Sequence, residues 1–282
     1  MESSRQNELD GTQLMTNQRM QDQAHLRNVA YKDDRRLNAR IEFWKAYGTS
    51  REDWSNSFFD LIDLPTSATI LDVGCGPAHF WEWGAENDRI SKGWQFTLTD
   101  LSEGMLESAK ANLSDLRDQI EFMTADVCEL PFEDARFDLI VANYMLYHAS
   151  DLAEAIREIH RVLKTDGTLL AATNSEGHIS ELLDLQERHA VSSKEIAHVG
   201  LAHKAFTLEN GVAPLKQYFS TVRTVVYSSP ALATDPEILI NYMESMDAEL
   251  NMKSLAEEVR HHISENGHFA VTRSSGVLVA TK

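Results

Sequence analysis

Two glycines follow a short aliphatic run that ends in an acid, in the stretch "ILDVGCGPAHF". Gly74 and Gly76 allow the backbone to turn tightly and to approach a ligand closely, which a Cβ atom would prevent. In an open parallel sheet, ligands bind at the carboxyl ends of the strands, and amide groups at the start of the next helix can bind a carboxylate. This turn is therefore predicted to line a ligand site.

The ligand is predicted to be a nucleoside without a diphosphate. A dinucleotide fingerprint needs a third glycine at position 79, where this chain has His79, and this counts against NAD. Further along, "TLTDLSEGM" ends a predicted strand with Asp100, whose carboxylate could accept both hydroxyls of a ribose. An NAD-dependent oxidoreductase on a similar sheet is the alternative that the missing glycine disfavours.

Two histidines follow later strand-like runs and are candidates for a general base. His148 closes "NYMLYH" and His178 lies in "TNSEGHI", so both are expected to face the place where cofactor and acceptor meet. The alternative is that each only contacts a lid or caps a helix. Tyr144 lies in the same neighbourhood and is the third catalytic candidate.

Other reactive side chains are not predicted to do chemistry. The group His261, His262 and His268 lacks cysteines or carboxylates at metal-ligand spacing, so no metal site is expected. The two cysteines, Cys75 and Cys128, are interpreted as small, tolerated side chains and not as nucleophiles.

Short strand-like runs alternate with helical patterns and would position these residues. The runs "TILDV", "QFTLTD", "IEFMTA", "DLIVAN" and "TLLAAT" predict a parallel sheet, with "DLAEAIREIHRVL" as the clearest helix between them. Two later runs, "VRTVVY" and "GVLVATK", could bring the sheet to seven strands. The predicted fold class is α/β, with a doubly wound sheet.

Four motifs in order resemble the class I S-adenosylmethionine-dependent methyltransferases of the bacterial small-molecule group with a methyltransferase type 11 domain. They are "ILDVGCGPA", "LTDLSEGML", "ADVCELPFEDARFDLIVANYMLYH" and "RVLKTDGTLL". The resemblance implies a seven-stranded Rossmann-like sheet with an N-terminal helical lid and a helical insertion after strand 5. It also implies S-adenosyl-L-methionine as the cofactor and methyl transfer to an O or N nucleophile of a small molecule or short peptide.

The resemblance further implies a set of cofactor contacts from the strand ends and the loops after them: Asp72, Gly74, Cys75, Gly76, Asp100, Leu101, Met105, Asp126, Val127 and Asn143. Asp72 would fix the turn, Asp100 would bind the ribose, and Asn143 would lie near the sulfonium. Leu101 and Met105 would flank the adenine, whose edge Asp126 and Val127 would contact. The family usually has glycine where this chain has Ala78, which would tighten the turn.

The segment "YKDDRRLNARIEFWKAYG" resembles the family's N-terminal lid, which folds over the bound cofactor. Tyr31 and Arg40 are expected to lie over the cofactor, with Trp44 and Tyr47, and Arg40 is a candidate partner for the cofactor carboxylate. A catalytically inactive cofactor-binding scaffold would carry the same features, and binding without turnover would distinguish it.

Composition limits the partners. The chain has 282 residues, 43% of them hydrophobic, and a net charge of −18, which disfavours nucleic acid and favours neutral or cationic acceptors. No run reaches the roughly 18 apolar residues of a membrane span, and no signal peptide is recognised, so a cytoplasmic protein without membrane contact is expected. Residues 1–28 are predicted to be a mobile tail, and residues 29–282 one domain, with the lid at 29–64 and a substrate-shaping insertion at 174–221.

Overall fold

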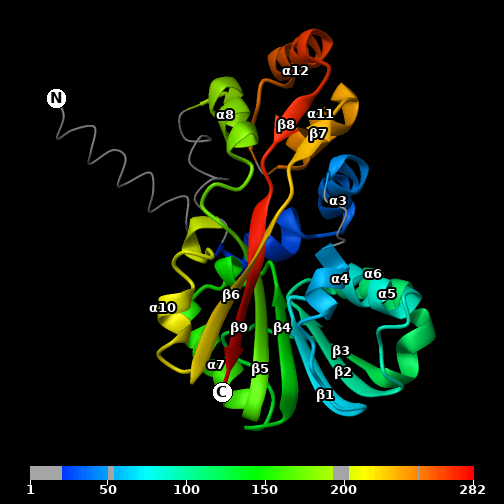
Figure 1. The fold of residues 1–282 in the computed structure, drawn as a ribbon, viewed down its shortest axis with the longest axis vertical. Helices are drawn as coiled ribbons and strands as arrows, with labels where there is room; N and C mark the ends of the chain where they lie inside the picture. The colour runs from blue at the N-terminus through cyan, green and yellow to red at the C-terminus, as the bar shows by residue number, and fades with distance from the viewer. Residues whose placement is uncertain (1–20, 50–53, 193–202, 247) are drawn as a thin grey trace, which may run out of the picture.

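The computed structural model of the protein describes residues 21–49, 54–192, 203–246 and 248–282. Its centre is a seven-stranded sheet with the strand order β3-β2-β1-β4-β5-β9-β6 (Figure 1). The strands are β1 (Ser67–Val73), β2 (Gly93–Asp100), β3 (Ile120–Thr124), β4 (Phe137–Asn143), β5 (Leu163–Asn174), β6 (Thr221–Ser228) and β9 (Ser274–Thr281). The predicted seven-stranded α/β fold is confirmed.

The sheet has one reversal of strand order that matters for function. The chain runs outward from β1 through β2 to β3 and then returns to the other side of β1 as β4, with parallel pairing throughout. Strand β9 pairs antiparallel with both β5 and β6. The carboxyl ends of β1 and β4 therefore lie side by side at a topological switch point, the usual ligand position in such sheets.

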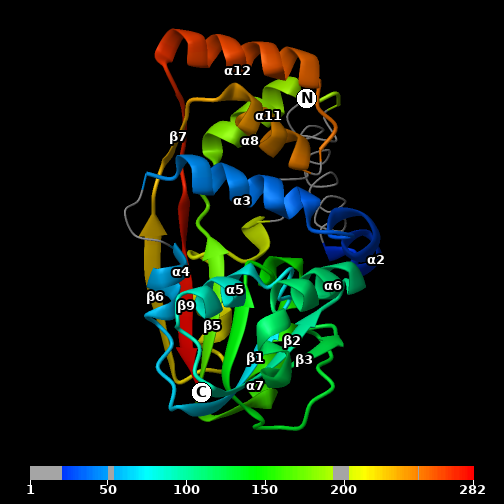
Figure 2. The ribbon, with the colours of Figure 1, turned by 90° about the vertical axis from the view of Figure 1, so that its right-hand side faces the viewer.

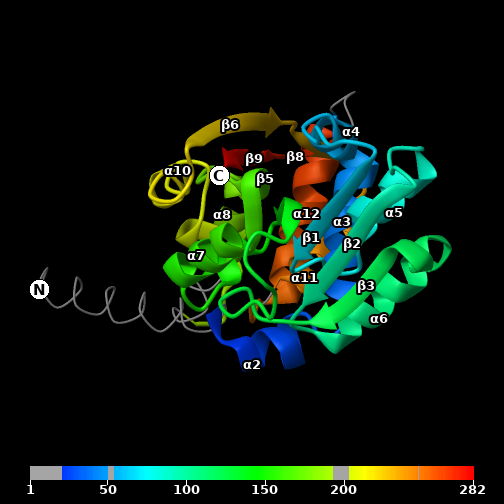
Figure 3. The ribbon, with the colours of Figure 1, turned by 90° about the horizontal axis from the view of Figure 1, so that it is seen from below.

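Helices cover both faces of the sheet (Figure 3). On one face, α4 (Trp54–Phe59), α5 (His79–Glu86) and α6 (Glu103–Asn112) bury side chains against β1, β2 and β4. On the other, α7 (Leu152–Val162) and α10 (Val212–Leu215) pack with a separate apolar cluster. Short helical turns link these layers: η2 (Ser114–Gln119), η3 (Leu146–His148) and η4 (His203–Ala205).

Helix α7 shows how local sequence sets an element. The side chain of Asp151 accepts a hydrogen bond from the backbone N–H of Glu154 at 3.0 Å and so caps the first turn. Ile156 and Ile159, three residues apart, are both fully buried against the sheet. The predicted amphipathic helix is found at this place.

A cap with its own apolar core stands above the carboxyl ends of the strands (Figures 1 and 2). It consists of α3 (Arg35–Tyr47), α8 (Ser180–His189), α11 (Pro236–Ser245), α12 (Met252–Asn266) and the two-stranded sheet of β7 (Ala231–Ala233) and β8 (Phe269–Val271). Helix α3 lies at the bottom of this cap, next to the sheet, and its Phe43 is fully buried in the cap core.

Two excursions of the chain build the cap, where the sequence had suggested one. The expected insertion at 174–221 supplies α8, but the chain leaves the sheet again between β6 and β9 and adds α11 and α12. In the stretch "LENGVAPLKQYF", only Val212–Leu215 is α-helical. A glycine and a proline in this stretch limit helix length.

The described N-terminal segment is helical from Gln23 to Ala30. The first 20 residues of the predicted tail lie outside the described residues, but α2 (Gln23–His25) and the π-helix η1 (Leu26–Ala30) precede Tyr31, and Leu26 is 4% exposed. The expected lid helices are present as α3 and α4. In the described part of the chain, no helix is long and apolar enough to cross a membrane, and no group of three potential metal ligands occurs.

Candidate active site

The glycine turn joins β1 to α5 at the switch point. Gly74 and Gly76 have positive φ angles of 66° and 56°. A Cβ on Gly74 would lie 2.8 Å from the Cβ of Met145, so this glycine is required for both its conformation and the close approach. Ala78, where the related family has glycine, also has a positive φ of 60°. The turn thus keeps its shape with a strained alanine at the start of α5.

Asp72, directly before the turn, is a buried carboxyl group with one free oxygen. Its Oδ2 accepts a hydrogen bond from the indole N–H of Trp81 at 2.7 Å, whereas its Oδ1 has no partner among the described residues. Burial raises the pKa of Asp72 to about 8, the indole hydrogen bond opposes this, and the charge of Asp100 adds to the rise. The group is therefore prepared to become a carboxylate when a cation arrives.

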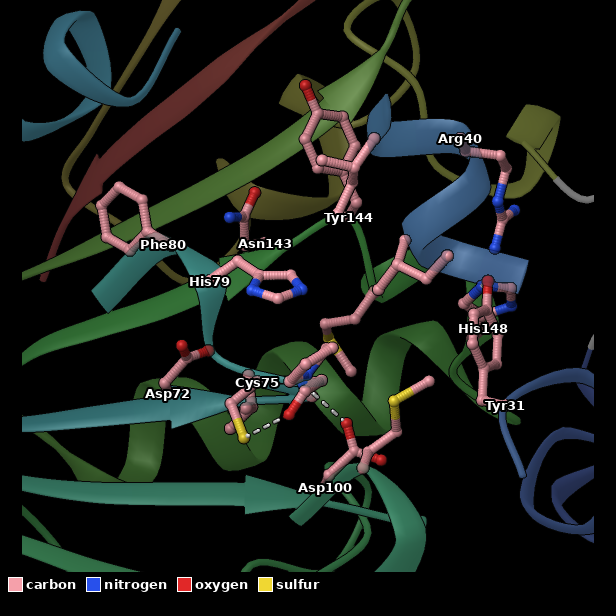
Figure 4. A pocket seen from close by; sticks show the side chains of 18 of the residues that line it. Tyr31, Arg40, Asp72, Cys75, His79, Phe80, Asp100, Asn143, Tyr144 and His148 are labelled. Atoms are coloured by element: carbon pink, nitrogen blue, oxygen red, sulfur yellow. Dashed lines mark hydrogen bonds between the residues drawn. The ribbon is translucent and has the colours of Figure 1, made fainter. Parts of the chain in front are cut away.

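Asp100 ties the end of β2 to the glycine turn. One of its oxygens accepts from the N–H of Gly76 at 2.9 Å and the other from the N–H of Ser102 at 2.8 Å (Figure 4). Burial raises the pKa of Asp100, and these backbone hydrogen bonds partly offset the rise. Each oxygen retains a lone pair for a further donor, such as a ribose hydroxyl.

The predicted adenine contacts lie on the same side of the cavity. Met105 and Val127 are 1% and 6% exposed and offer apolar surface, and Leu101 also borders the cavity. Asp126 uses one oxygen to accept from the backbone N–H of Cys128 at 2.9 Å. Its second oxygen has no hydrogen bond among those that the structure records.

Asn143 ends β4 and Tyr144 follows it, and both side chains border the cavity (Figure 4). The side-chain oxygen of Asn143 and the phenol oxygen of Tyr144 are buried without a hydrogen-bond partner among the described residues. Burial raises the pKa of the Tyr144 phenol, while Arg273 and Ser275 nearby oppose that rise. Both oxygens are available to a ligand.

His148 forms a pair with the lid. Its Nε2 lies 2.9 Å from the phenol oxygen of Tyr31, and the two rings meet edge to face at 5.3 Å (Figure 4). His148 is 9% exposed, and the guanidinium of Arg40 lies 5.9 Å from the centre of the Tyr31 ring. Tyr31 and His148 thus form a hydrogen-bonded pair, and both residues border the cavity.

His178 is held more rigidly than a free base would be. Its Nδ1 accepts a hydrogen bond from the backbone N–H of Ser274 at 3.3 Å, and its ring stacks on Trp44 of α3 at 5.8 Å. Nδ1 is therefore already engaged by the backbone of the β9 start. The position fits a residue that fixes the lid to the cap at least as well as it fits a base.

Sequence reasoning missed Arg273, which lies between β8 and β9. Its guanidinium carbon lies 5.2 Å from the ring centre of Trp44, 5.7 Å from that of Trp54 and 5.1 Å from that of Tyr227. The stretch "VTRSSG" has no motif that indicates such a site. Trp44 was expected over the cofactor, but Trp54 and Tyr227 were not predicted as site residues.

A cavity of about 730 Å³ brings the predicted site together and is in the size range of small-molecule sites, roughly 300–1,000 Å³. The residues predicted to be catalytic or to contact the cofactor border it: Tyr31, Arg40, Asp72, Gly74, Cys75, Gly76, Asp100, Leu101, Met105, Asp126, Val127, Asn143, Tyr144, His148 and His178. Tyr47, which was also expected over the cofactor, does not border the cavity, because it packs in the cap and its hydroxyl accepts from the backbone N–H of Asp235 at 3.2 Å. The individual roles given to these residues stay predictions. The unpaired Asp72 and Asn143 oxygens in its wall fit a ligand that carries positive charge and N–H or C–H donors.

The fold is a doubly wound α/β domain whose switch point carries a glycine turn held by Asp100. Residues 71–171 match the family model of a methyltransferase domain. This segment is similar to class I S-adenosylmethionine-dependent methyltransferases, as the motifs had indicated.

Three known proteins illustrate the relationship. Demethylmenaquinone methyltransferase of Staphylococcus epidermidis is 32% identical over 165 residues, covering 58% of this chain and 65% of that protein. Malonyl-[acyl-carrier protein] O-methyltransferase of Pseudescherichia vulneris is 32% identical over 140 residues, covering 49% and 50%. The match thus spans less than two thirds of either relative.

The third is a solved structure that shares the fold. Phosphoethanolamine N-methyltransferase 2 of Haemonchus contortus, in complex with phosphomonomethylethanolamine and S-adenosylhomocysteine, superposes with a TM-score of 0.54 at 19% identity. The superposition covers 87% of this chain and 56% of that one. At this identity the likeness concerns the fold alone.

Proposed function

We propose that the protein binds S-adenosylmethionine at the switch point and transfers its methyl group to an O or N nucleophile of a small molecule or short peptide. One observation carries the proposal. The glycine turn is tied to Asp100, and the unpaired oxygens of Asp72 and Asn143 border the same cavity. A nucleoside with a cationic tail would satisfy all of these groups together.

The chain's own residues fit this cofactor. Asp100 would hold the ribose, the apolar surfaces of Leu101 and Met105 would enclose the adenine, and Arg40 would pair with the carboxylate. When bound, S-adenosylmethionine supplies an electrophilic methyl group on a positively charged sulfur. Asp72 and Asn143 would stabilise the nearby positive charge through their free oxygens.

The protein then has to align the acceptor and exclude water. Helix α3 carries Arg40 and Trp44 over the strand ends and forms the roof of the cavity (Figure 2). The carbonyl of Lys32, just before α3, packs so closely on α6 that a Cβ at Gly104 would lie 2.1 Å from it. The start of the lid therefore packs against the part of the domain that would hold the cofactor. Opening of the lid would control the access of ligands to the cavity.

Tyr31 and His148 would take the proton of a hydroxyl or amine acceptor. The 2.9 Å contact between the phenol oxygen and Nε2 allows the imidazole to accept the phenol proton as Tyr31 accepts one from the acceptor. Tyr144, with its buried, unpaired phenol oxygen, would orient the acceptor. A carboxylate acceptor would need neither step.

The test has two parts. Calorimetry of the full chain should detect binding of S-adenosylmethionine and S-adenosylhomocysteine but not of NADH, and Asp100→Ala should weaken both by tenfold or more. Formation of S-adenosylhomocysteine with a panel of phenols, amines and carboxylic acids would then measure turnover. Absence of nucleoside binding would refute the proposal, and binding without turnover by any acceptor would identify a scaffold.

A further inference from the structure

Arg273 is enclosed by aromatic rings at the end of the cavity formed by the lid and the cap. Trp44 comes from α3, Trp54 from α4 and Tyr227 from β6, and each ring centre lies within 5.7 Å of the guanidinium carbon. Aromatic faces attract a cation but accept few hydrogen bonds, whereas a guanidinium has five N–H donors in a rigid plane. The rings therefore position the charge without accepting its N–H groups, and the phenol of Tyr144 is a polar group that interacts with it.

No acid compensates this charge in the described part of the chain. Ion pairs are recorded there for other arginines, such as Arg161 with Glu158 and Asp134 at 2.7 and 2.8 Å, but none for Arg273 or Arg40. Guanidinium groups at protein interiors are normally paired. An unpaired guanidinium bordering a cavity is a place for an anionic ligand.

Acidic and basic side chains border different parts of the cavity. The acids Asp72, Asp100 and Asp126 lie at the strand ends, whereas Arg40 and Arg273 lie toward the lid and cap. This local arrangement differs from the net charge of −18, which had favoured neutral or cationic acceptors. The cofactor carboxylate would use one guanidinium, Arg40, and so Arg273 is left for the second ligand.

We propose that Arg273 binds a carboxylate group of the methyl acceptor, held between Trp44, Trp54 and Tyr227. The inference rests on the proposed function, because it names the acceptor class for the same cavity. A planar carboxylate matches the fork of N–H groups on a guanidinium, and the surrounding rings favour an acceptor with an aromatic or other apolar body. Acceptors are thus expected to be small carboxylic acids.

The experiment uses full-length protein saturated with S-adenosylhomocysteine. Benzoate, phenylacetate and indole-3-acetate are titrated by calorimetry, each beside its neutral primary amide. The carboxylates are expected to bind at least tenfold more tightly than their amides, and Arg273→Gln should remove this preference. Arg273→Lys keeps the charge but loses the fork, and should recover only part of it.

The matched control is Arg223→Gln, an exposed arginine on β6 that does not border the cavity. It should leave the carboxylate preference unchanged. Binding of S-adenosylhomocysteine should survive Arg273→Gln, and this also shows that the Arg273→Gln variant is folded. The same binding should weaken with Arg40→Gln.

Each outcome decides between the two proposals. Equal binding of acids and amides, or no acid-specific binding across the series, overturns the role of Arg273 while the proposed function stands. Loss of S-adenosylhomocysteine binding in Arg273→Gln also overturns it, because Arg273 would then serve the cofactor. Failure of the unmodified protein to bind the nucleoside would overturn the proposed function instead.

Discussion

Replacing Asp72 by asparagine should stabilise the ligand-free protein and weaken its binding of S-adenosylmethionine. Asp72 is 2% exposed and has one oxygen without a partner. Its pKa is raised by burial from 3.8 to about 8. Asparagine keeps the carbonyl that accepts from Trp81 but cannot ionise, so the variant never has to hold a buried charge.

The pH dependence follows from the direction of this shift. Between about pH 4 and 8 the folded protein keeps a proton on Asp72 that the unfolded chain has released, so stability falls as pH rises across this window. At pH 7 the loss amounts to as much as roughly 4 kcal/mol, at about 1.4 kcal/mol per pH unit. The asparagine variant lacks this slope. Its melting temperature should exceed that of the unmodified protein by several degrees at pH 8, and the difference should shrink toward pH 4.

Binding of S-adenosylmethionine should favour the charged form of Asp72. A cation next to Asp72 favours the carboxylate, so binding of S-adenosylmethionine near pH 7 should release up to one proton, measurable by calorimetry in phosphate and Tris buffers. The variant should release none and should bind S-adenosylmethionine about tenfold or more weakly, with a smaller loss for the uncharged sulfur of S-adenosylhomocysteine.

Asp138→Asn is the matched control. Burial acts to raise the pKa of Asp138, but hydrogen bonds from Thr69 and Lys164 outweigh it and lower the pKa. This substitution should therefore destabilise the protein near neutral pH, where the Asp72 substitution stabilises it. Identical pH profiles and identical cofactor affinity for the unmodified protein and Asp72→Asn would refute the reasoning.

Three further substitutions test the site. Gly74→Ala places a Cβ 2.8 Å from Met145 at a φ of 66°, so it should lower the melting temperature and abolish cofactor binding. Gly177→Ala, where nothing lies near the added Cβ, should do neither. Asp100→Ala removes the acceptor for the N–H groups of Gly76 and Ser102, and a cofactor dissociation constant raised less than tenfold would contradict its role. Tyr31→Phe should lower kcat at least tenfold with little change in cofactor affinity. Adding His148→Gln to this variant should lower kcat little further, because the two residues act as one proton acceptor. Additive losses of kcat in the double variant would show that the two residues have independent roles.

The sheet could be predicted because its signals are local. Each strand is a short apolar run that ends at a polar or glycine residue, and helices such as Leu152–Val162 repeat their apolar positions at helical spacing. The order of the motifs then fixed which strand ends meet. Residues such as Gly74, Asp100 and Asn143 were identified because their position at a strand end determines where their side chains lie.

The contacts in the part of the cavity near the lid and the cap, where the acceptor would bind, could not be predicted in this way. The residues that form this part come from elements far apart in the sequence. Tyr31 and His148 are 117 positions apart, and the rings around Arg273 come from α3, α4 and β6. No spacing in the sequence links them. The cap is assembled from two excursions separated by β6. The packing of Phe43 of α3 against Tyr242 of α11, with ring centres 5.1 Å apart, helps to position the lid against the second excursion. Specificity for the acceptor therefore depends on contacts between elements that the sheet does not order, so we expect related chains with the same motifs to differ most in this part of the cavity.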